Sequence, residues 1–268
     1  MLLRFRNKFW QICIACTVVC FLFSLCHGEE KDSKKEVNKY FSTTSLSLVL
    51  TKGNNENLTF SFDTDQNFHF KKNRFNLKGR FIQSNSNGKK KSEIYYSHLK
   101  YSREISNRIY VLAFFRFERN KLAGYNFRFA NSIGGGCLWV KREKIEFSSE
   151  SAIGWNNENT QKKVAINNIP NSTAMIEKTM SASFVSTLMT HKLIYNVSPS
   201  AQLVLQEIIF LNLEDLKDYR TNTFTSLSTS INRHFGLNTS LQVIYERKPV
   251  PGYKHKDFYL LSSFVIKI

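Results

Sequence analysis

The sequence predicts an all-β protein, a closed antiparallel transmembrane β-barrel of about 12 strands in a bacterial outer membrane. Apolar and polar residues alternate through most of residues 44–268, and the chain opens with a secretion signal. After that signal, no apolar run approaches the roughly 20 residues that a membrane-spanning helix needs. An exported chain without such helices satisfies its backbone hydrogen bonds in lipid only as a closed barrel.

Residues 1–28 have the composition of a cleavable signal peptide. A basic N-terminal region is followed by the apolar residues 12–25, and a stretch of about fourteen residues is too short to span a bilayer as a helix. We expect cleavage before Glu29. Lipidation of Cys26 is an alternative, although Leu25 is larger than the residue that such a site prefers just before the cysteine.

The composition of the mature chain excludes some classes of protein. Only Cys137 remains after the signal, so a small secreted disulfide scaffold and a cysteine-based metal site are excluded. The formal charge is +17 for the whole chain and +14 without the three basic residues of the signal. Nucleic acid, anionic lipid headgroups or lipopolysaccharide phosphates would attract such a charge, and lysines that solvate loops would also account for it. Since no nucleic-acid motif is present, we expect no nucleic-acid partner.

A polar N-terminal tail, residues 29–43, precedes the barrel domain, residues 44–268. The alternation is clearest over residues 58–70, where leucine and phenylalanine side chains occupy one strand face and polar side chains the other. All four prolines fall in breaks or at the first residue of a strand, where no ladder hydrogen bond is lost. The predicted strands are 44–52, 57–71, 74–84, 92–103, 107–118, 123–141, 143–155, 178–194, 199–212, 219–232, 236–248 and 257–268.

The connections between these strands alternate in length. Those after odd-numbered strands are generally longer than those after even-numbered strands, which is the asymmetry of outer-membrane barrels with short periplasmic turns. The longest break, residues 156–177, is polar and is predicted to be a mobile extracellular loop. The last strand is amphipathic and resembles the sorting signal of the barrel-assembly machinery, except that it ends in Ile268 and not in an aromatic residue.

Short motifs recur in order along the mature chain. They are Gly53-Asn54 with Glu56-Asn57, Asn107-Arg108-Ile109-Tyr110, residues 117–125, Arg128 followed by Gly134-Gly135-Gly136-Cys137-Leu138-Trp139, Glu150 with Gly154-Trp155, residues 231–237, and Pro249-Val250-Pro251 with His255-Lys256-Asp257. Together they resemble the salt-induced outer membrane protein family, a domain family of unknown function. This resemblance implies an exported outer-membrane β-barrel with no established activity, and it supplies no catalytic residues.

Two groups of residues bear on the lumen of the predicted barrel. Arg116, Glu118 and Arg128 lie on or near facing strands, where they would either form a buried ion network or solvate the rim. Gly134, Gly135 and Gly136 remove side chains from a strand interior, as a sharp curve or a tight lumen requires. A phosphate-cradling loop is the alternative for these glycines, and it would need a following helix.

Catalytic chemistry has little support in the sequence. The mature chain has five histidines, namely His69, His98, His191, His234 and His255. A Ser-His-acid arrangement could be assembled from His98 with Ser97 or Ser102 and Asp63, but no spacing requires it.

Metal and cofactor sites have no clear signal either. No zinc-binding histidine pattern occurs, and Asp63 and Asp65 share a strand face that could hold a cation but more often meets water. We therefore predict no catalytic, cofactor-binding or metal residues, no cofactor and no enzymatic activity. Tyrosines and tryptophans near strand ends are predicted to form interfacial girdles, or to pack in a soluble core.

The sequence thus predicts an integral protein of the cell outer membrane, exported through its cleaved signal. Its expected role is structural or stress-related in the envelope, or that of a narrow channel. The alternatives are an outer-membrane enzyme that acts on lipid or lipopolysaccharide and a soluble secreted β-barrel binder. The expected partners are outer-membrane lipids, lipopolysaccharide and, during biogenesis, the barrel-assembly machinery; we expect a monomer.

Overall fold

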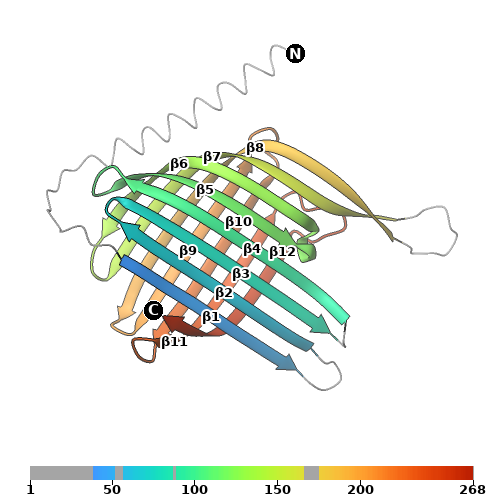
Figure 1. The fold of residues 1–268 in the computed structure, drawn as a ribbon. Coiled ribbons are helices and arrows are strands. Elements are labelled where there is room, and N and C mark those ends of the chain that lie inside the picture. The colour runs from blue at the N-terminus through green and yellow to red at the C-terminus, as the bar shows by residue number, and fades with distance from the viewer. Residues whose placement is uncertain (1–38, 52–56, 87–88, 166–174, 268) are drawn as a thin grey trace, which may run out of the picture.

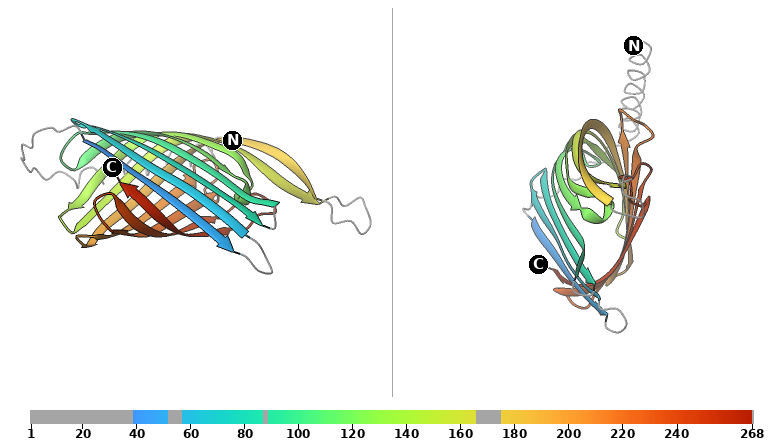
Figure 2. Two further views of the ribbon diagram at one scale, coloured as in Figure 1. Left: turned by 60° about the horizontal axis from the view of Figure 1, so that its bottom comes forward. Right: turned by 90° about the vertical axis from the view of Figure 1, so that its right-hand side faces the viewer.

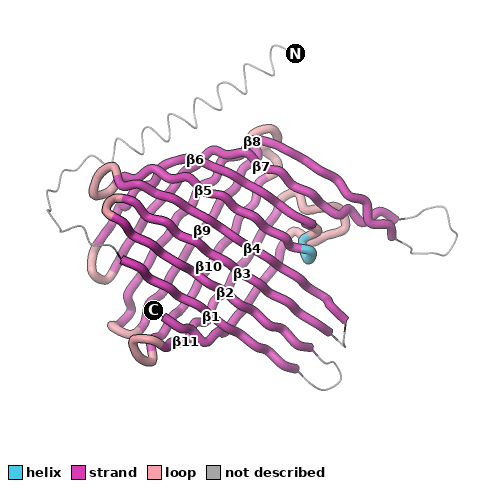
Figure 3. Tube along the Cα trace, viewed as in Figure 1, coloured by secondary structure: helices cyan, strands magenta, loops and turns pink. Residues whose placement is uncertain are grey.

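The computed structural model describes residues 39–51, 57–86, 89–165 and 175–267 (Figure 1). Every strand runs antiparallel to its neighbours in sequence, and the first strand also pairs with the last, which closes the barrel. The predicted fold class, a closed all-β barrel of about 12 strands, is therefore confirmed. Figure 3 shows that strands make up nearly all of the described chain. No helix in these ranges is long and apolar enough to cross a membrane.

The elements follow one another in simple order around the barrel. They are β1 (Lys39–Thr51), β2 (Asn57–Phe70), β3 (Asn73–Ser86), β4 (Lys89–Glu104), β5 (Ile109–Asn120), the short 3-10 helix η1 (Lys121–Ala123), β6 (Tyr125–Lys141), β7 (Ile145–Ala165), β8 (Met175–Ser198), β9 (Ala201–Asn212), β10 (Tyr219–Ser230), β11 (Phe235–Glu246) and β12 (Lys256–Lys267).

The two rims of the barrel differ, as the sequence predicts. We call the rim with connections 121–124, 213–218 and 247–255 the loop end. The opposite rim, with connections such as 71–72 and 199–200, is the turn end. The β1–β12 ladder that closes the barrel spans only four residue pairs, and these lie toward the turn end.

One correction concerns the N-terminal boundary of the barrel. Residues 39–43, which the sequence assigned to the tail, are the beginning of β1 and pair with β2. The Tyr40 ring lies 4.7 Å from that of Phe68, measured between centroids. The adjacent aromatic residues Tyr40 and Phe41 break the apolar–polar alternation, which hid the strand character of this segment. The predicted signal peptide, residues 1–28, and the remainder of the predicted tail lie outside the described residues.

A second correction concerns the predicted loop at 156–177. Residues 156–165 belong to β7 and residues 175–177 to β8, and Figure 1 shows these strand ends projecting beyond the rest of the barrel. Cross-strand side-chain hydrogen bonds join them, such as Asn157 Nδ2 to Ser183 Oγ at 2.9 Å. Because polar residues occupy both faces of these strand ends, the period-two pattern that reveals a strand is missing there.

Shortening this hairpin is expected to leave the barrel intact. Gln161 and Thr179 stand opposite each other, so residues 162–178 can be replaced by a two-residue turn without changing the register. We expect the shortened protein to keep its faster migration in a cold detergent gel before heating. A longer deletion, which also removes residues 157–161 and 179–183, takes Glu158 out of the interior and is expected to abolish that shift. Loss of the shift in the shorter deletion would show that the projecting hairpin is needed for folding.

The outward side of the wall is rich in large apolar side chains. Leu48, Ile133 and Leu260, on three different strands, have exposed fractions of 68%, 66% and 72%. Alternate residues point inward and are mostly polar or charged. Figure 2 shows the wall that these strands form in two further views. The exposed apolar surface therefore extends around the barrel and faces away from the interior.

Candidate functional site in the barrel lumen

Arg128 reaches the interior from the middle of an alternating segment of β6. Its neighbours Phe127 and Phe129 are exposed, so the two rings face outward and the guanidinium group faces inward. In the register of the sheet, Arg128 stands opposite Glu118 on β5 and opposite Glu158 on β7. Carboxylates therefore flank the guanidinium on both sides, with Nη1 3.3 Å from Oε2 of Glu118 and Nε 3.1 Å from Oε1 of Glu158.

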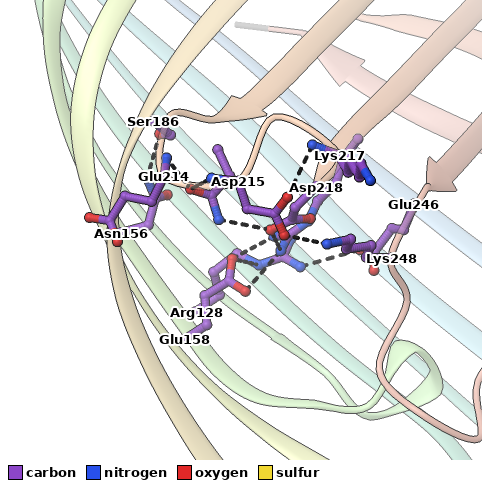
Figure 4. Close-up of polar contacts among 12 residues, drawn as sticks. Arg128, Asn156, Glu158, Ser186, Glu214, Asp215, Lys217, Asp218, Glu246 and Lys248 are labelled. Atoms are coloured by element: carbon purple, nitrogen blue, oxygen red, sulfur yellow. Dashed lines mark hydrogen bonds and ion pairs between the residues drawn. The ribbon is translucent and has the colours of Figure 1, made fainter. Parts of the chain in front are cut away.

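Further groups reach Arg128 and Glu158 from a different part of the wall. Arg128 Nη2 donates to Oε1 of Glu246 on β11 at 3.2 Å, and the Tyr125 hydroxyl donates to Oε2 of the same carboxylate at 2.7 Å. Arg220 on β10 donates to Oε2 of Glu158 at 3.0 Å. Because β6 and β7 are not sheet neighbours of β10 and β11, these contacts cross the interior (Figure 4). We call this group the lumen bridge: Glu118, Tyr125, Arg128, Glu158, Arg220 and Glu246.

The charged members of the lumen bridge are held away from solvent. Arg128 and Glu158 have exposed fractions of 6% and 4%. Charges in such surroundings are costly unless partners compensate them. The Tyr125 ring adds a cation–π contact, with the guanidinium carbon of Arg128 3.7 Å from its centroid. The bridge therefore ties two parts of the wall together through groups that depend on one another.

The connection 247–255 lies against the bridge at the loop end. Val250 is buried in a cluster with Ala123 and Tyr125, and Tyr253 packs against the same cluster. Since this connection joins β11 to β12 while Ala123 and Tyr125 border the start of β6, the contact again crosses from one part of the wall to another.

The connection 213–218 is attached to the same region. Asp218 lies 3.5 Å from Arg220, measured from Oδ2 to Nη2, and Asp215 forms an ion pair with Lys248 of the neighbouring loop (Figure 4). The hydrogen bond from Lys248 is the main cause that lowers the pKa of the exposed Asp215 carboxyl. The two loops are therefore linked to each other and to the bridge.

Two further polar contacts occupy the interior nearer to the turn end. Lys100 on β4 forms an ion pair with Glu150 on β7, and the Tyr110 hydroxyl donates to Oε1 of Glu150 at 2.7 Å. Arg80 on β3 donates to Oε1 of Gln242 on β11 at 2.7 Å. Both contacts join strands that are not sheet neighbours, so the walls are connected at several levels.

Apolar side chains fill other parts of the interior. Ile82, Ile94 and Leu261 form a buried cluster that joins β3 and β4 to β12. A second buried cluster joins β5 to β7 and consists of Leu112, Phe114 and Ala152. With the polar contacts described above, these clusters place side chains across several parts of the interior.

Gly134 and Gly136 are required by this close packing. A Cβ atom at Gly136 would lie 2.3 Å from Cζ of Tyr110, and one at Gly134 would lie 2.0 Å from the carbonyl oxygen of Ser151. The expectation of a tight lumen is therefore confirmed at Gly136, beside the inward-facing Tyr110 ring, whereas Gly134 is required by the close approach of β6 to β7. The phosphate-loop alternative is wrong, because β6 continues to Lys141 and the next described element is β7, a strand.

The structure brings together two of the three charged residues that the sequence grouped. Glu118 and Arg128 form an ion pair and are buried or nearly so, which confirms the lumen network and contradicts the rim alternative for them. Arg116 lies on the same face of β5, but it forms no ion pair with any residue in the described ranges. Its guanidinium is therefore not ion-paired with the carboxylates of the bridge.

The histidine arrangement considered from the sequence is not assembled. His98 faces the interior, where its Nδ1 lies 3.3 Å from the Tyr96 hydroxyl. Ser97 precedes His98 on the strand and faces outward. Ser102 shares the inner face, but no hydrogen bond joins it to His98 within the described chain. Asp63 forms its ion pair with Arg80 instead.

The two aspartates that the sequence suggested as a cation site are paired with basic side chains of the protein itself. Asp63 pairs with Arg80, and Oδ2 of Asp65 lies 3.2 Å from Nζ of Lys78. In the part of the chain that the structure describes, no group of three or more histidine, cysteine, aspartate or glutamate residues could hold a metal ion. Tyr110 and Tyr125, two of the tyrosines near strand ends that were predicted to form interfacial girdles, point into the lumen and not outward.

Most of the bridge was missed in the sequence. Glu158 fell in the segment predicted as a loop, and Arg220 and Glu246 are separated from Arg128 by more than ninety residues. A signal was present: each is an ionisable residue near the loop end of its strand. Pairing them would have required the sheet register and the closure of the barrel.

Residues 44–268 match a protein family described as "Protein of unknown function, DUF481". No curated protein matches the chain.

Several solved structures are similar in fold. The NanC porin is 7% identical with a TM-score of 0.45, over 85% of this chain and 97% of that one. The COG4313 outer membrane channel from Pseudomonas putida F1 is 10% identical with a TM-score of 0.49, over 90% and 100%. The translocator domain of the autotransporter NalP from Neisseria meningitidis is 10% identical with a TM-score of 0.37, over 96% and 94%. At these identities the likeness is one of fold and indicates no shared activity.

Proposed function

The chain belongs to the DUF481 family of proteins of unknown function, and from its lumen we propose an integral outer-membrane β-barrel that acts as a narrow, normally closed channel. The lumen bridge is the observation that carries this proposal, because the buried ion pairs Arg128–Glu246 and Arg220–Glu158 join separate parts of the wall across the path that a solute would take. A general diffusion pore needs an open aqueous lumen. With the bridge in place, we expect the barrel to serve the envelope as a structural component, including under salt stress.

The outer-membrane location rests on the exposed apolar wall and on the unequal rims. A soluble binder would leave this apolar surface in water, which is unfavourable over so large an area. We propose outer-membrane lipids and lipopolysaccharide as the surroundings, with the barrel-assembly machinery as the partner during biogenesis and a monomer as the working form. Extraction from outer-membrane fractions only with detergent, and a gel shift between unheated and boiled samples, are the expected results. Recovery in the aqueous phase would favour the soluble binder.

Planar-bilayer conductance tests the closed state. We expect the wild-type protein to give little steady conductance at neutral pH. The triple variant Tyr125→Ala, Arg128→Ala, Glu246→Ala removes one positive and one negative charge, and it leaves Glu158 paired with Arg220. This variant is expected to show a clear rise in steady conductance, because the contacts between β6 and β11 are gone.

A matched control removes an ion pair that does not cross the lumen. Asp65→Ala with Lys78→Ala deletes a pair between the adjacent strands β2 and β3, and it is expected to leave the conductance near the wild-type value. A large, steady wild-type conductance that equals that of the triple variant would contradict the proposal.

A further inference from the structure

Ser149, His191 and Glu207 form one row across three neighbouring strands. In the register of the sheet, Ser149 on β7 stands opposite His191 on β8, and His191 stands opposite Glu207 on β9. The Ser149 hydroxyl lies 2.9 Å from Nδ1 of His191. Directly opposed residues point to the same side of a sheet, so all three side chains share one face.

That face is the outer wall. Glu150 follows Ser149 in β7 and contacts Lys100 and Tyr110 in the interior, so Ser149 points the other way. Glu207 is exposed, whereas Ser149 and His191 are half-buried. The row is therefore separated from the lumen bridge by the thickness of the sheet.

The row lies within the apolar part of the wall and not at its edge. Along β8 the outward residues on either side of His191 are Met189 and Leu193. Along β9, Leu205 and Ile209 flank Glu207 in the same way. A charged side chain on the lipid face of a barrel is destabilising, by up to about 2–4 kcal/mol for a basic residue at the midplane and less for an acidic one.

The other outward-facing ionisable residues lie where a charged side chain needs no functional explanation. Among strand residues with described side chains they are Glu93, Arg103, Arg119 and Lys256, which lie toward the ends of their strands. An ionisable group inside the apolar zone of a membrane protein more often serves a function. Here a histidine and a glutamate occur side by side, and a serine hydroxyl completes the row.

We propose that this row is an acyl-ester hydrolase site on the outer wall, with Ser149 as the nucleophile, His191 as the general base and Glu207 as a positioning residue. The substrate is the carboxylic ester of a membrane lipid, because lipid acyl chains are what the surrounding apolar wall contacts. The proposal departs from the sequence prediction of no enzymatic activity, and it does not depend on the state of the lumen.

The reaction needs only water as a second substrate. His191 Nδ1 takes the proton of Ser149 as Oγ bonds to the ester carbonyl carbon, and the protonated ring then gives that proton to the departing alcohol oxygen. The resulting acyl-serine is cleaved by water, whose proton passes to His191 and then to Oγ. The products are a free fatty acid, the deacylated lipid and the original enzyme.

Glu207 is placed to orient the imidazole. With Nδ1 directed at Ser149, the second ring nitrogen, Nε2, is left to donate to a carboxylate. No ion pair joins Glu207 to His191 in the described structure, but directly opposed residues have Cβ atoms only about 4.5–5.5 Å apart. Catalytic hydrogen bonds are often formed fully only when substrate is bound.

Lipid hydrolysis and covalent labelling test the site together. The full-length protein, extracted from outer membranes in detergent, is mixed with micelles of phosphatidylethanolamine or of lipid A, and released fatty acid is measured by mass spectrometry. A fluorophosphonate probe is added separately, and the labelled peptide is identified. We expect fatty acid from one of the two lipids, which identifies the lipid class, and covalent labelling of Ser149.

Variants separate the chemical roles. Ser149→Ala and His191→Gln are each expected to lower the rate by about 10³-fold or more, and the double variant by no more than either alone. Glu207→Gln is expected to lower kcat with little change in KM, and Glu207→Asp to recover part of the rate. Ser151→Ala, which changes the next outward-facing serine on β7, is the matched control and should keep wild-type activity.

Two results would overturn the proposal. One is the absence of both fatty-acid release and Ser149 labelling in wild-type protein that shows the folded gel shift. The other is hydrolysis that persists in folded Ser149→Ala, which would assign the activity to a different site.

Discussion

Replacing Arg128 with leucine is expected to lower the free energy of unfolding by about 3–5 kcal/mol, because it leaves buried carboxylates without their partner. Glu118, Glu158 and Glu246 all contact this one guanidinium, and among the described residues only Glu158 retains an ion pair with another cation, Arg220. The measurement is urea-induced unfolding of the protein in liposomes, with the fraction folded read from the gel shift between unheated and boiled samples.

Arg74→Leu provides the control for this prediction. Arg74 pairs with Glu104, but their side chains are 43% and 35% exposed, so solvent screens the interaction. Exposed ion pairs contribute about 0–1 kcal/mol, and we expect the loss to stay in that range. Equal destabilisation by the two variants would show that Arg128 is not held in a buried network and would weaken the case for a closed lumen.

Gly134→Ala is expected to prevent most of the protein from reaching the folded barrel. The added Cβ would lie 2.0 Å from the carbonyl oxygen of Ser151 and 2.6 Å from the Cα atom of Ala152. Both are main-chain atoms of β7, so relief requires the β6–β7 ladder to move and cannot come from a change of rotamer. The measurement is the fraction of outer-membrane protein that migrates as the folded form in a cold detergent gel.

The adjacent Gly135→Ala is the matched control for the packing argument. Gly135 stands next to Gly134 on β6 and, by the alternation of the strand, points outward. We expect this variant to fold like the wild type. If both variants lost the folded form equally, the requirement would lie in backbone freedom along the glycine run and not in contact between β6 and β7.

The two proposed activities occupy opposite sides of the same wall and can fail separately. The lumen bridge predicts conductance, and its variants leave the outer wall unchanged. The Ser149 row predicts ester hydrolysis, and its variants leave the interior unchanged. The barrel can therefore prove to be closed and lack hydrolase activity, or it can conduct and still hydrolyse esters. Conductance and fatty-acid release distinguish these outcomes.

The strand pattern was predictable because it depends on local information. Along β2 the alternation of apolar and polar residues directly records which side chains face outward and which face inward. The alternation is lost where the surroundings of a strand are no longer different on its two faces. The projecting ends of β7 and β8 are polar on both faces, so Glu158 was assigned to a loop.

The sequence by itself determined the barrel class, most of the strand positions and the unequal rims. Only the tertiary structure decided that Arg128 meets Glu246, and that Ser149, His191 and Glu207 stand in one row. The physical reason is that such contacts depend on the register between strands. A shift of one residue in that register reverses the face of every side chain on the shifted strand.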